Sequence, residues 1–214
     1  MNMYLKTTSA ALVLLTSAAH AELNHGTPVE NICATDKVAA KVSKTYQDVA
    51  GAPLPVVSRM TGQLEVHVAT SIKDAVTVAV TPELTKRIWT TIDAWGADTY
   101  TNLVFTMGGK HVLDFRHKIP TREVDLDDGW LDIYADGGAG VHGHLWLDRV
   151  STVVATEVPG KGDHNTRAIS FYGPDGKLAI GVYSSISTKE VDQAAVDGFY
   201  KTREFLASLP QACK

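Results

Sequence analysis

The sequence lacks any run of lysine or arginine, and its formal net charge at pH 7 is −4. Nucleic acid is therefore a poor partner for the chain, and so is an anionic membrane surface. The chain also lacks a nucleophile motif and the G-x-G-x-x-G fingerprint of dinucleotide-binding enzymes. It shows no internal repeat and no low-complexity tract. What it does contain is an apolar fraction of 44%, which is enough to fill the core of one domain.

Long hydrophobic runs are also missing. The apolar stretch from Ala10 to Ala19 is far too short to span a bilayer. A charged start precedes it and an A-x-A sequence follows it, ending at Ala21, which is typical of a secretory signal peptide over residues 1–21. We therefore expect cleavage before Glu22, a periplasmic or secreted protein, and no membrane insertion. A buried N-terminal helix is the alternative.

Cysteine is scarce, with only Cys33 and Cys213 near opposite ends of the mature chain. In an oxidising compartment an even pair favours a disulfide. Closing so long a loop stabilises a fold by about 5 kcal/mol in the chain-entropy model. Two separate free thiols are the alternative.

Apolar residues at helical spacing predict three helices, over residues 36–50, 81–96 and 187–209. The second has Thr81 as its cap and Pro82 at its first position. The third begins with a capping box formed by Ser187 and Glu190. Gly198 inside this helix costs about 1 kcal/mol relative to alanine.

Seven strand-like runs separated by short turns follow the second helix, at residues 100–106, 111–119, 129–135, 141–148, 151–158, 167–173 and 177–184. Residues 62–80 fit either a helix or a strand. Short links favour antiparallel neighbours. The sequence therefore predicts an α+β fold, with a large antiparallel sheet flanked by N- and C-terminal helices that pack on one face.

Residues 140–148, GVHGHLWLD, hold two histidines one residue apart in an otherwise apolar run. Side chains two residues apart in a strand point the same way, so His142, His144, Trp146 and Asp148 are expected on one face. Imidazole binds zinc, copper and haem iron, and an indole beside it suits a flat aromatic ligand. The alternative is that both histidines bond to water on a solvated face.

His111 and His117 belong to another strand run, on the face of Leu113, Phe115 and Ile119. Taken singly, each fits a partly buried histidine paired to backbone. Four histidines within 34 residues of expected sheet nevertheless favour a ligand.

The stretch from residue 62 to residue 206, about two thirds of the chain, resembles the haem-utilisation carriers of the HutX/ChuX type, the half-length relatives of HemS-like proteins. The order and spacing of its segments and their strand–turn pattern make the resemblance specific. The matching segments are GQLEVHVA (62–69), IWTTIDAWG (88–96), LVFT (103–106), HVLDF (111–115), GHLWLD (143–148) and TRAISFYGPDGKLAIGVYS (166–184).

This resemblance implies an antiparallel sheet flanked by helices, b-type haem bound non-covalently, and pairing of two subunits as a homodimer. A glycine–histidine pair before an apolar strand contacts haem in the family, and Gly143-His144 match it. The resemblance therefore assigns iron ligation to His144. The implied domain covers residues 62–214, after an N-terminal helical extension over residues 22–61.

The chain departs from the family where a second histidine lies in a segment of the form L-V-H-T. Here the segment reads Leu103-Val104-Phe105-Thr106, and Phe105 can stack on a porphyrin but cannot bind iron. Three outcomes are open: five-coordinate iron through His144, loss of haem binding, or substitution by one of His111, His117 and His142.

Haem also needs an apolar slot and cations for its propionates. Trp146 and Phe105 are candidate ring contacts, and the alternative for both is a core aromatic. Candidate cations flank the expected pocket strands, and the alternative for each is a solvated surface charge; they are Arg116, Lys110 and Arg167.

The sequence thus favours an exported haem-binding protein that carries or scavenges haem in iron uptake. The family's members work in the cytoplasm, so an exported member would act in the periplasm or outside the cell. A haem-degrading enzyme is one alternative, because some full-length relatives break haem open. A zinc or copper site is another, built from His142 and His144 with one or two of His111, His117 and Asp148. A fourth is a relative that kept the sheet and changed its ligand.

Overall fold

The computed structural model describes residues 27–107, 111–123, 129–162 and 164–213. Within these residues the helices are α1 (Asp36–Asp48), α2 (Leu54–Thr61), α3 (Glu65–Thr70), α4 (Pro82–Asp93) and α5 (Gln193–Ala207). The strands are β1 (Val76–Ala79), β2 (Tyr100–Met107), β3 (His111–Lys118), β4 (Thr121–Arg122), β5 (Trp130–Tyr134), β6 (His142–Trp146), β7 (Thr152–Val158), β8 (Thr166–Tyr172) and β9 (Leu178–Ser185). The α+β class is confirmed, and the ambiguous segment 62–80 contains both α3 and β1.

Local capping explains where two of the predicted helices begin. The hydroxyl of Thr35 accepts a hydrogen bond from the backbone N–H of Val38 and so caps α1. In the same way Thr81 accepts from Leu84 and caps α4, with Pro82 at the first helical position. Such side chains satisfy N–H groups that the first helical turn leaves without partners.

The last helix begins later than predicted, and the capping box at Ser187 is not formed. Asp192 caps α5 instead, because its carboxylate accepts a hydrogen bond from the backbone N–H of Ala194 at 2.9 Å. The other carboxylate oxygen accepts from the backbone N–H of Tyr100, also at 2.9 Å. Asp192 therefore fixes the start of α5 and the start of β2 together, a tertiary contact that local sequence does not show.

The glycine inside α5 has a packing reason. A Cβ atom on Gly198 would collide with the indole ring of Trp95, just beyond the end of α4. The indole N–H donates to the hydroxyl of Thr202 on α5 at 3.0 Å. Gly198 thus lets α4 and α5 approach closely, which offsets its low helix propensity.

Six strands form one antiparallel sheet in the order β1-β7-β8-β9-β2-β3. The links β2–β3, β7–β8 and β8–β9 are hairpins between sequence neighbours, as the short turns predict. β4, β5 and β6 form a separate three-stranded antiparallel sheet. The strand runs are therefore where the sequence predicts them, but they are divided between two sheets.

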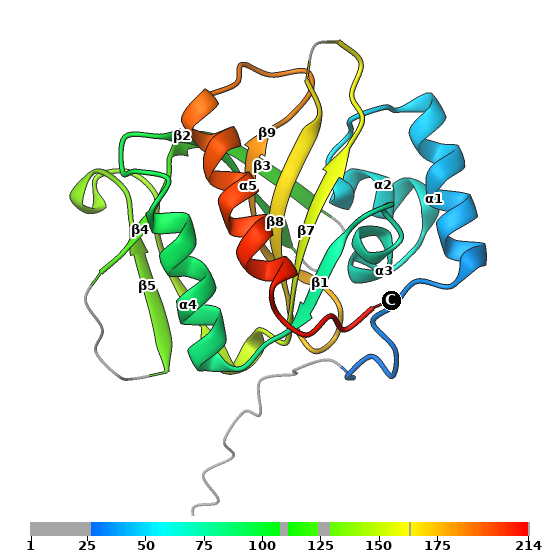
Figure 1. Ribbon diagram of the computed structural model, residues 1–214, viewed down its shortest axis with the longest axis horizontal. Coiled ribbons are helices and arrows are strands. Elements are labelled where there is room, and N and C mark those ends of the chain that lie inside the picture. Colours follow the sequence, from blue (N-terminus) through cyan, green and yellow to red (C-terminus); the bar gives the residue numbers. More distant parts are fainter. Residues whose placement is uncertain (1–26, 108–110, 124–128, 163, 214) are drawn as a thin grey trace, which may run out of the picture.

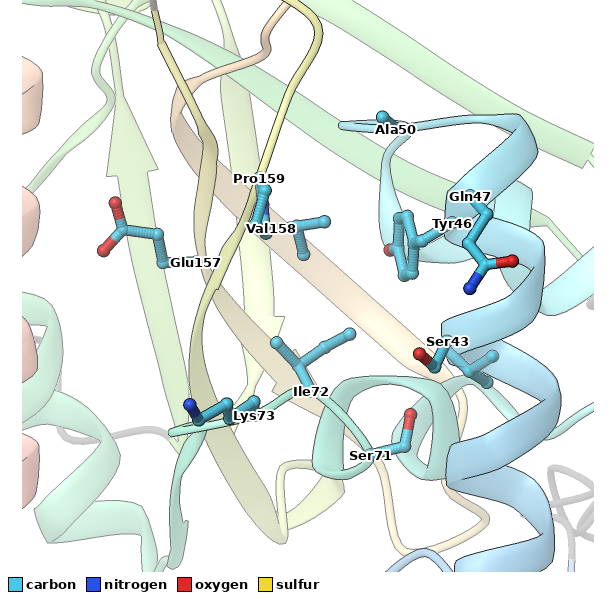
Figure 2. Close-up of a pocket in the computed structure, with 11 residues that line it drawn as sticks. Ser43, Tyr46, Gln47, Ala50, Ser71, Ile72, Lys73, Glu157, Val158 and Pro159 are labelled. Carbon is cyan, nitrogen blue, oxygen red and sulfur yellow. The ribbon is translucent and has the colours of Figure 1, made fainter.

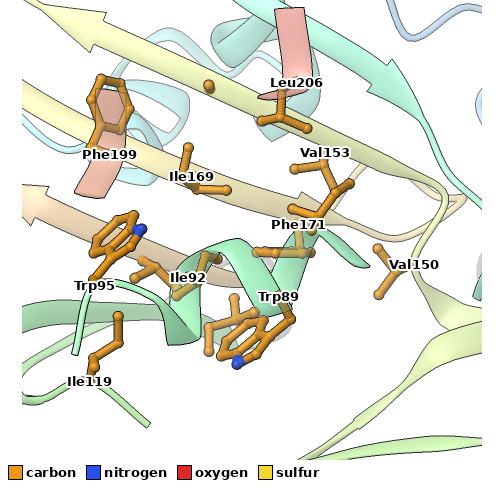
Figure 3. Close-up of a cluster of buried hydrophobic side chains, with 14 of the residues drawn as sticks. Trp89, Ile92, Trp95, Ile119, Val150, Val153, Ile169, Phe171, Phe199 and Leu206 are labelled. Atoms are coloured by element: carbon orange, nitrogen blue, oxygen red, sulfur yellow. The ribbon is translucent and has the colours of Figure 1, made fainter. Parts of the chain in front are cut away.

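Helices cover both faces of the large sheet rather than one, which corrects the prediction (Figure 1). One face packs on α4 and α5, and its core holds Trp89, Ile92, Phe171, Phe199 and Leu206 (Figure 3). The other face packs on α1, α2 and α3 around a second cluster of buried side chains. Alternate residues of a single strand supply both clusters, as side-chain alternation requires: in β7, Val153 belongs to the first and Val154 to the second.

The small sheet lies beside α4 (Figure 1) and has one buried face. Leu131 and Ile133 of β5 are buried in the same core cluster as α4 and α5. Asp93 at the end of α4 accepts a hydrogen bond from the backbone N–H of Arg122 in β4 at 2.9 Å. Burial raises the pKa of the Asp93 carboxyl above its ordinary value, although its contacts with Arg122 act in the opposite direction. The opposite face of the small sheet carries the predicted histidines.

The predicted disulfide between Cys33 and Cys213 is present. It joins the segment before α1 to the segment after α5, close to the start of β1, where the N–H of Ala212 donates to the carbonyl of Thr77 at 2.8 Å. Among the helices of the described residues, none is both long and apolar enough to cross a membrane. The predicted signal peptide, residues 1–21, lies outside the described part of the chain.

Candidate functional site

The register of the small sheet brings six polar and aromatic side chains together on its outer face. Three of the five cross-strand pairs between β5 and β6 direct their side chains to this face. Because the residues alternate along both strands, all six side chains lie on the same side. They are Trp130 with Trp146, Asp132 with His144, and Tyr134 with His142.

His144 is held at the centre of this face, with 49% of its side chain exposed. Its Nδ1 atom donates a short hydrogen bond to the carboxylate of Asp132. A carboxylate accepts hydrogen bonds, so Nδ1 carries the proton and Nε2 presents a lone pair. The Nε2 atom lies 3.0 Å from Nε2 of His142, which can donate to it. This carboxylate–histidine arrangement is the one that orients metal-binding imidazoles in proteins.

Aromatic rings surround the two imidazoles. Tyr134 stacks on His142 with ring centroids 4.7 Å apart and planes inclined by 20°. Trp130 stacks on Trp146 at 5.3 Å, and its edge meets the ring of His144 at 6.4 Å. The guanidinium of Arg149 lies 4.7 Å above the indole of Trp146. The outer face therefore combines flat aromatic surface, two imidazoles and a nearby cation.

The predicted face alternation is confirmed for His142, His144 and Trp146, but it does not extend to Asp148. The strand ends at Trp146, and a 3-10 turn over Leu147–Arg149 follows. Asp132 on the paired strand supplies the carboxylate beside His144 instead.

Three residues of this face were missed by reasoning from the sequence: Trp130, Asp132 and Tyr134. Their spacing in GWLDIYA has the same two-residue period as the histidine run. Pairing the two runs as a hairpin would have placed them opposite the histidines. The alternation of these three residues with the aliphatic residues Leu131 and Ile133, which are buried, also indicates that the three share the outer face.

His111 and His117 lie apart from the paired histidines, at opposite ends of β3 in the large sheet. His111 is exposed opposite Met107 at the free end of the β2–β3 hairpin. His117 packs against Gly140, in the turn before β6, where any Cβ would collide with the imidazole. Its Nδ1 atom lies 3.2 Å from the carbonyl of Lys118. His117 therefore joins the two sheets, as a partly buried structural histidine does.

Phe105 lies on a different surface from His144. Phe105 is partly buried against the core cluster that also contains the inner-face residues of the small sheet. His144 lies on the outer face of the small sheet and points away from that cluster. Phe105 meets Phe115 edge to face at 6.4 Å. Phe115 is 50% exposed and Leu113 38% exposed, on the same side of β3. We call Phe105, Met107, Leu113 and Phe115 the β2–β3 apolar patch.

The predicted propionate cations do not gather at the outer face. Arg116 lies on the other side of β3 from His111 and His117, and its guanidinium contacts the carbonyl and carboxylate of Glu190. Arg167 is bonded within the large sheet to Glu157 at 2.9 Å. Lys110 lies outside the described residues.

Among the described residues, cavities lie away from this face. One of about 340 Å³ lies between α1, the turn after α3 and the end of β7, with Tyr46, Ile72 and Val158 among its lining residues (Figure 2). Burial raises the pKa of the Tyr46 phenol well above its ordinary value. Another, of about 540 Å³, follows α2 and includes the ion pair Arg59–Glu65. None of the sequence-predicted haem residues lines either cavity.

In the described part of the chain, no group of three or more histidine, cysteine, aspartate or glutamate side chains is arranged to hold a metal ion. His111 and His117 do not join the paired histidines, so the wider metal site considered from the sequence is not formed.

A family model described as "Haem utilisation ChuX/HutX" matches residues 78–200, which is more than half of the chain. The match begins inside β1 and ends within α5, so it includes both sheets. No curated protein matches the chain significantly.

Solved structures share the fold at low sequence identity. The structure of the haem-binding protein ChuX superposes with a TM-score of 0.57 and 15% identity, covering 77% of this chain and 98% of that one. A protein from Erwinia carotovora superposes with a TM-score of 0.58 and 17% identity, over 77% and 98%. The haem-degrading enzyme ChuS of Escherichia coli O157:H7 superposes with a TM-score of 0.54 and 14% identity, over 76% of this chain and 47% of that one. This chain thus corresponds to about half of the ChuS chain.

Proposed function

This chain belongs to the haem utilisation ChuX/HutX family, and from that premise we propose that it binds haem with His144 as the iron ligand. The observation that carries the proposal is the pairing of Asp132 with Nδ1 of His144, which places the lone pair of that imidazole on Nε2, the atom that would ligate a metal. Trp130, Trp146 and Tyr134 supply flat apolar surface on either side of the imidazoles. Haem iron in proteins is commonly held by such a histidine.

Iron ligation would replace the hydrogen bond between the two Nε2 atoms. The two Nε2 atoms lie 3.0 Å apart, which is less than the roughly 4 Å that would separate two nitrogens bound on opposite sides of one metal at about 2.0 Å each. His144 alone would therefore hold the iron, and His142 would place a polar imidazole beside it.

The bound haem is proposed to be non-covalent. Covalent attachment as in c-type cytochromes uses cysteine thiols in a C-x-x-C-H motif, which this sequence lacks. Both of its cysteines are joined in the disulfide. Arg149 brings a positive charge beside Trp146, where a propionate would find a partner.

The direct test is a haem titration of the purified chain followed by absorption spectroscopy. The Soret band is expected to saturate at one haem per chain. Acidified butanone is expected to extract all of the haem, because the haem is not covalently attached. A titration that matches that of free haem would contradict the proposal.

Incubation of the complex with ascorbate in the presence of catalase separates a carrier from a degrading enzyme. A stable spectrum supports the carrier, and appearance of a bilin supports the enzyme.

Export and a role in carrying or scavenging haem during iron uptake are part of the same proposal. The signal-like residues 1–21 support export, as does the disulfide, since disulfides persist in oxidising compartments. Mass spectrometry of the chain expressed with its own N-terminus in a Gram-negative host tests this. A periplasmic product beginning at Glu22 is expected, and a cytoplasmic product that retains Met1 would contradict it.

We also propose that two copies pair as a homodimer through the β2–β3 apolar patch. Met107 is 57% exposed and Phe115 50% exposed, and exposed apolar side chains that gather in one place mark interaction surfaces. Light scattering should give twice the chain mass for the wild type and the single-chain mass for Phe115→Asp. A monomeric wild type would refute this part alone.

A further inference from the structure

The paired histidines have a geometry that suits a metal ion without a porphyrin. We propose that His142 and His144 together chelate one copper(II) ion through their Nε2 atoms. This inference does not depend on haem binding, although haem iron and copper would compete for Nε2 of His144.

The separation of the two nitrogens is the first observation. With metal–nitrogen bonds of about 2.0–2.1 Å, two ligands at right angles lie about 2.9 Å apart and two tetrahedral ligands about 3.3 Å apart. The observed Nε2–Nε2 separation is 3.0 Å, nearer to the right-angled value. Tetragonal coordination by nitrogen and oxygen is typical of copper(II), whereas zinc prefers a tetrahedron.

The second observation is that both rings are already oriented. Asp132 accepts the Nδ1 proton of His144, which directs Nε2 away from the strand. Tyr134 stacks on His142 and fixes the plane of its ring. The two imidazoles meet edge to face, inclined by 76°, so that their Nε2 atoms approach each other. Copper binding would replace the hydrogen bond between the two Nε2 atoms, and neutral His142 would then carry its proton on Nδ1, so that both Nε2 atoms present lone pairs. Little ordering of the side chains remains to be done when a metal binds.

The remaining coordination positions face solvent. His142 and His144 are both exposed, and the residues described contain no third histidine, cysteine or carboxylate placed to complete the site. Water or a small anion therefore fills the other positions. Imidazole affinity follows the order that places copper(II) above nickel(II) and zinc(II), so copper(II) binds most tightly.

The test is a titration of the haem-free protein, carrying no affinity tag, with copper(II) sulfate, followed by electron paramagnetic resonance. One tightly bound equivalent is expected, with hyperfine structure from two nitrogen ligands. His142→Ala and His144→Ala should each weaken binding by roughly tenfold or more, because the chelate becomes a single contact. Asp132→Asn should weaken it by about 10–100-fold, as loss of an orienting carboxylate does elsewhere.

His111→Ala is the matched control, since His111 is exposed on a strand in the other sheet, and it should leave the tight equivalent unchanged. Far-UV circular dichroism checks that each variant is folded. If His142→Ala binds copper as tightly as the wild type, or if the wild type shows no tight equivalent, the chelate does not exist. Haem titration of separate, copper-free samples keeps the two proposals distinguishable, because neither copper outcome changes the Soret result expected of the copper-free wild type.

Discussion

Asp132 on β5 and His144 on β6 stand directly opposite each other in the small sheet, and the carboxylate accepts a hydrogen bond from the imidazole. The contact fixes which nitrogen of His144 is available to a metal. It also joins the family's expected haem-contacting histidine to a carboxylate on a neighbouring strand.

Replacing Asp132 by asparagine should weaken haem binding by about 10–100-fold, since loss of an orienting carboxylate typically has this effect on a ligated metal. The amide can donate as well as accept, so Nδ1 of His144 loses its fixed proton. A Soret titration measures the change. Asp148→Asn is the control, because Asp148 lies in the turn after β6. Equal losses in the two variants would mean that the contact with His144 has no special role.

Replacing Gly198 by alanine should destabilise the fold, although alanine is the better helix former. The added methyl collides with the indole of Trp95, and overpacking of this kind costs about 1–3 kcal/mol. Urea unfolding followed by tryptophan fluorescence measures the free energy of unfolding. Lys201→Ala, an exposed change in the same helix, should stay within about 0.5 kcal/mol of the wild type. A gain in stability for Gly198→Ala would show that the two helices are not in close contact.

Reducing the disulfide should lower the free energy of unfolding by about 5 kcal/mol in the chain-entropy model. The large value follows from the 180-residue separation between Cys33 and Cys213. Unfolding curves recorded with and without dithiothreitol test it. In the double variant Cys33→Ser, Cys213→Ser, the reductant should have no effect. An identical curve for oxidised and reduced wild type would contradict the expectation.

Glu157 should make stability depend on pH. Burial raises the pKa of its carboxyl, but hydrogen bonds from Asn165, Arg167 and Tyr200 and the charge of Arg167 outweigh burial, so the pKa lies below its ordinary value of 4.5. A lowered folded-state pKa contributes stability above pH 4.5, and this contribution is lost as the pH falls through the folded-state pKa.

We therefore expect Glu157→Gln to be less stable than the wild type by roughly 1 kcal/mol near neutral pH. The difference should shrink as the pH falls below 4.5. Chemical unfolding at several pH values measures it, with the exposed Glu204→Gln as control. A difference that grows towards low pH would show that the sign is wrong.

The sequence predicted β2, β3 and β5 to β9 because each is a strand-like apolar run between clear turns. It did not predict the two-residue strand β4, and β1 lies in the segment that fits either a helix or a strand. The division into two sheets was not predictable in the same way, since it depends on which strands pair rather than on where they lie. Asp132 was not predicted as a site residue for the same reason: it is distant from His144 in the sequence, and only the pairing of β5 with β6 places the two opposite each other. The start of α5 was missed because Asp192 contacts β2, a tertiary interaction that competes with the local capping box at Ser187.

The structure brings together only some of the residues that the sequence assigns to the site. His142, His144 and Trp146 lie together because they belong to one strand. Phe105 belongs to the large sheet and lies on another surface, so its place in a haem site stays a prediction. His111 was assigned to the site because its strand run is close in sequence to the histidine run. In the structure His111 lies opposite Met107 at the start of β3, in the other sheet.

The central claim is that Nε2 of His144 ligates haem iron, and the most direct measurement is a pair of haem titrations on single variants with matched exposure. His144→Ala should lose the saturable Soret band or shift it and weaken binding by roughly tenfold or more. His111→Ala should titrate as the wild type does. Identical titrations of wild type and His144→Ala would contradict the account.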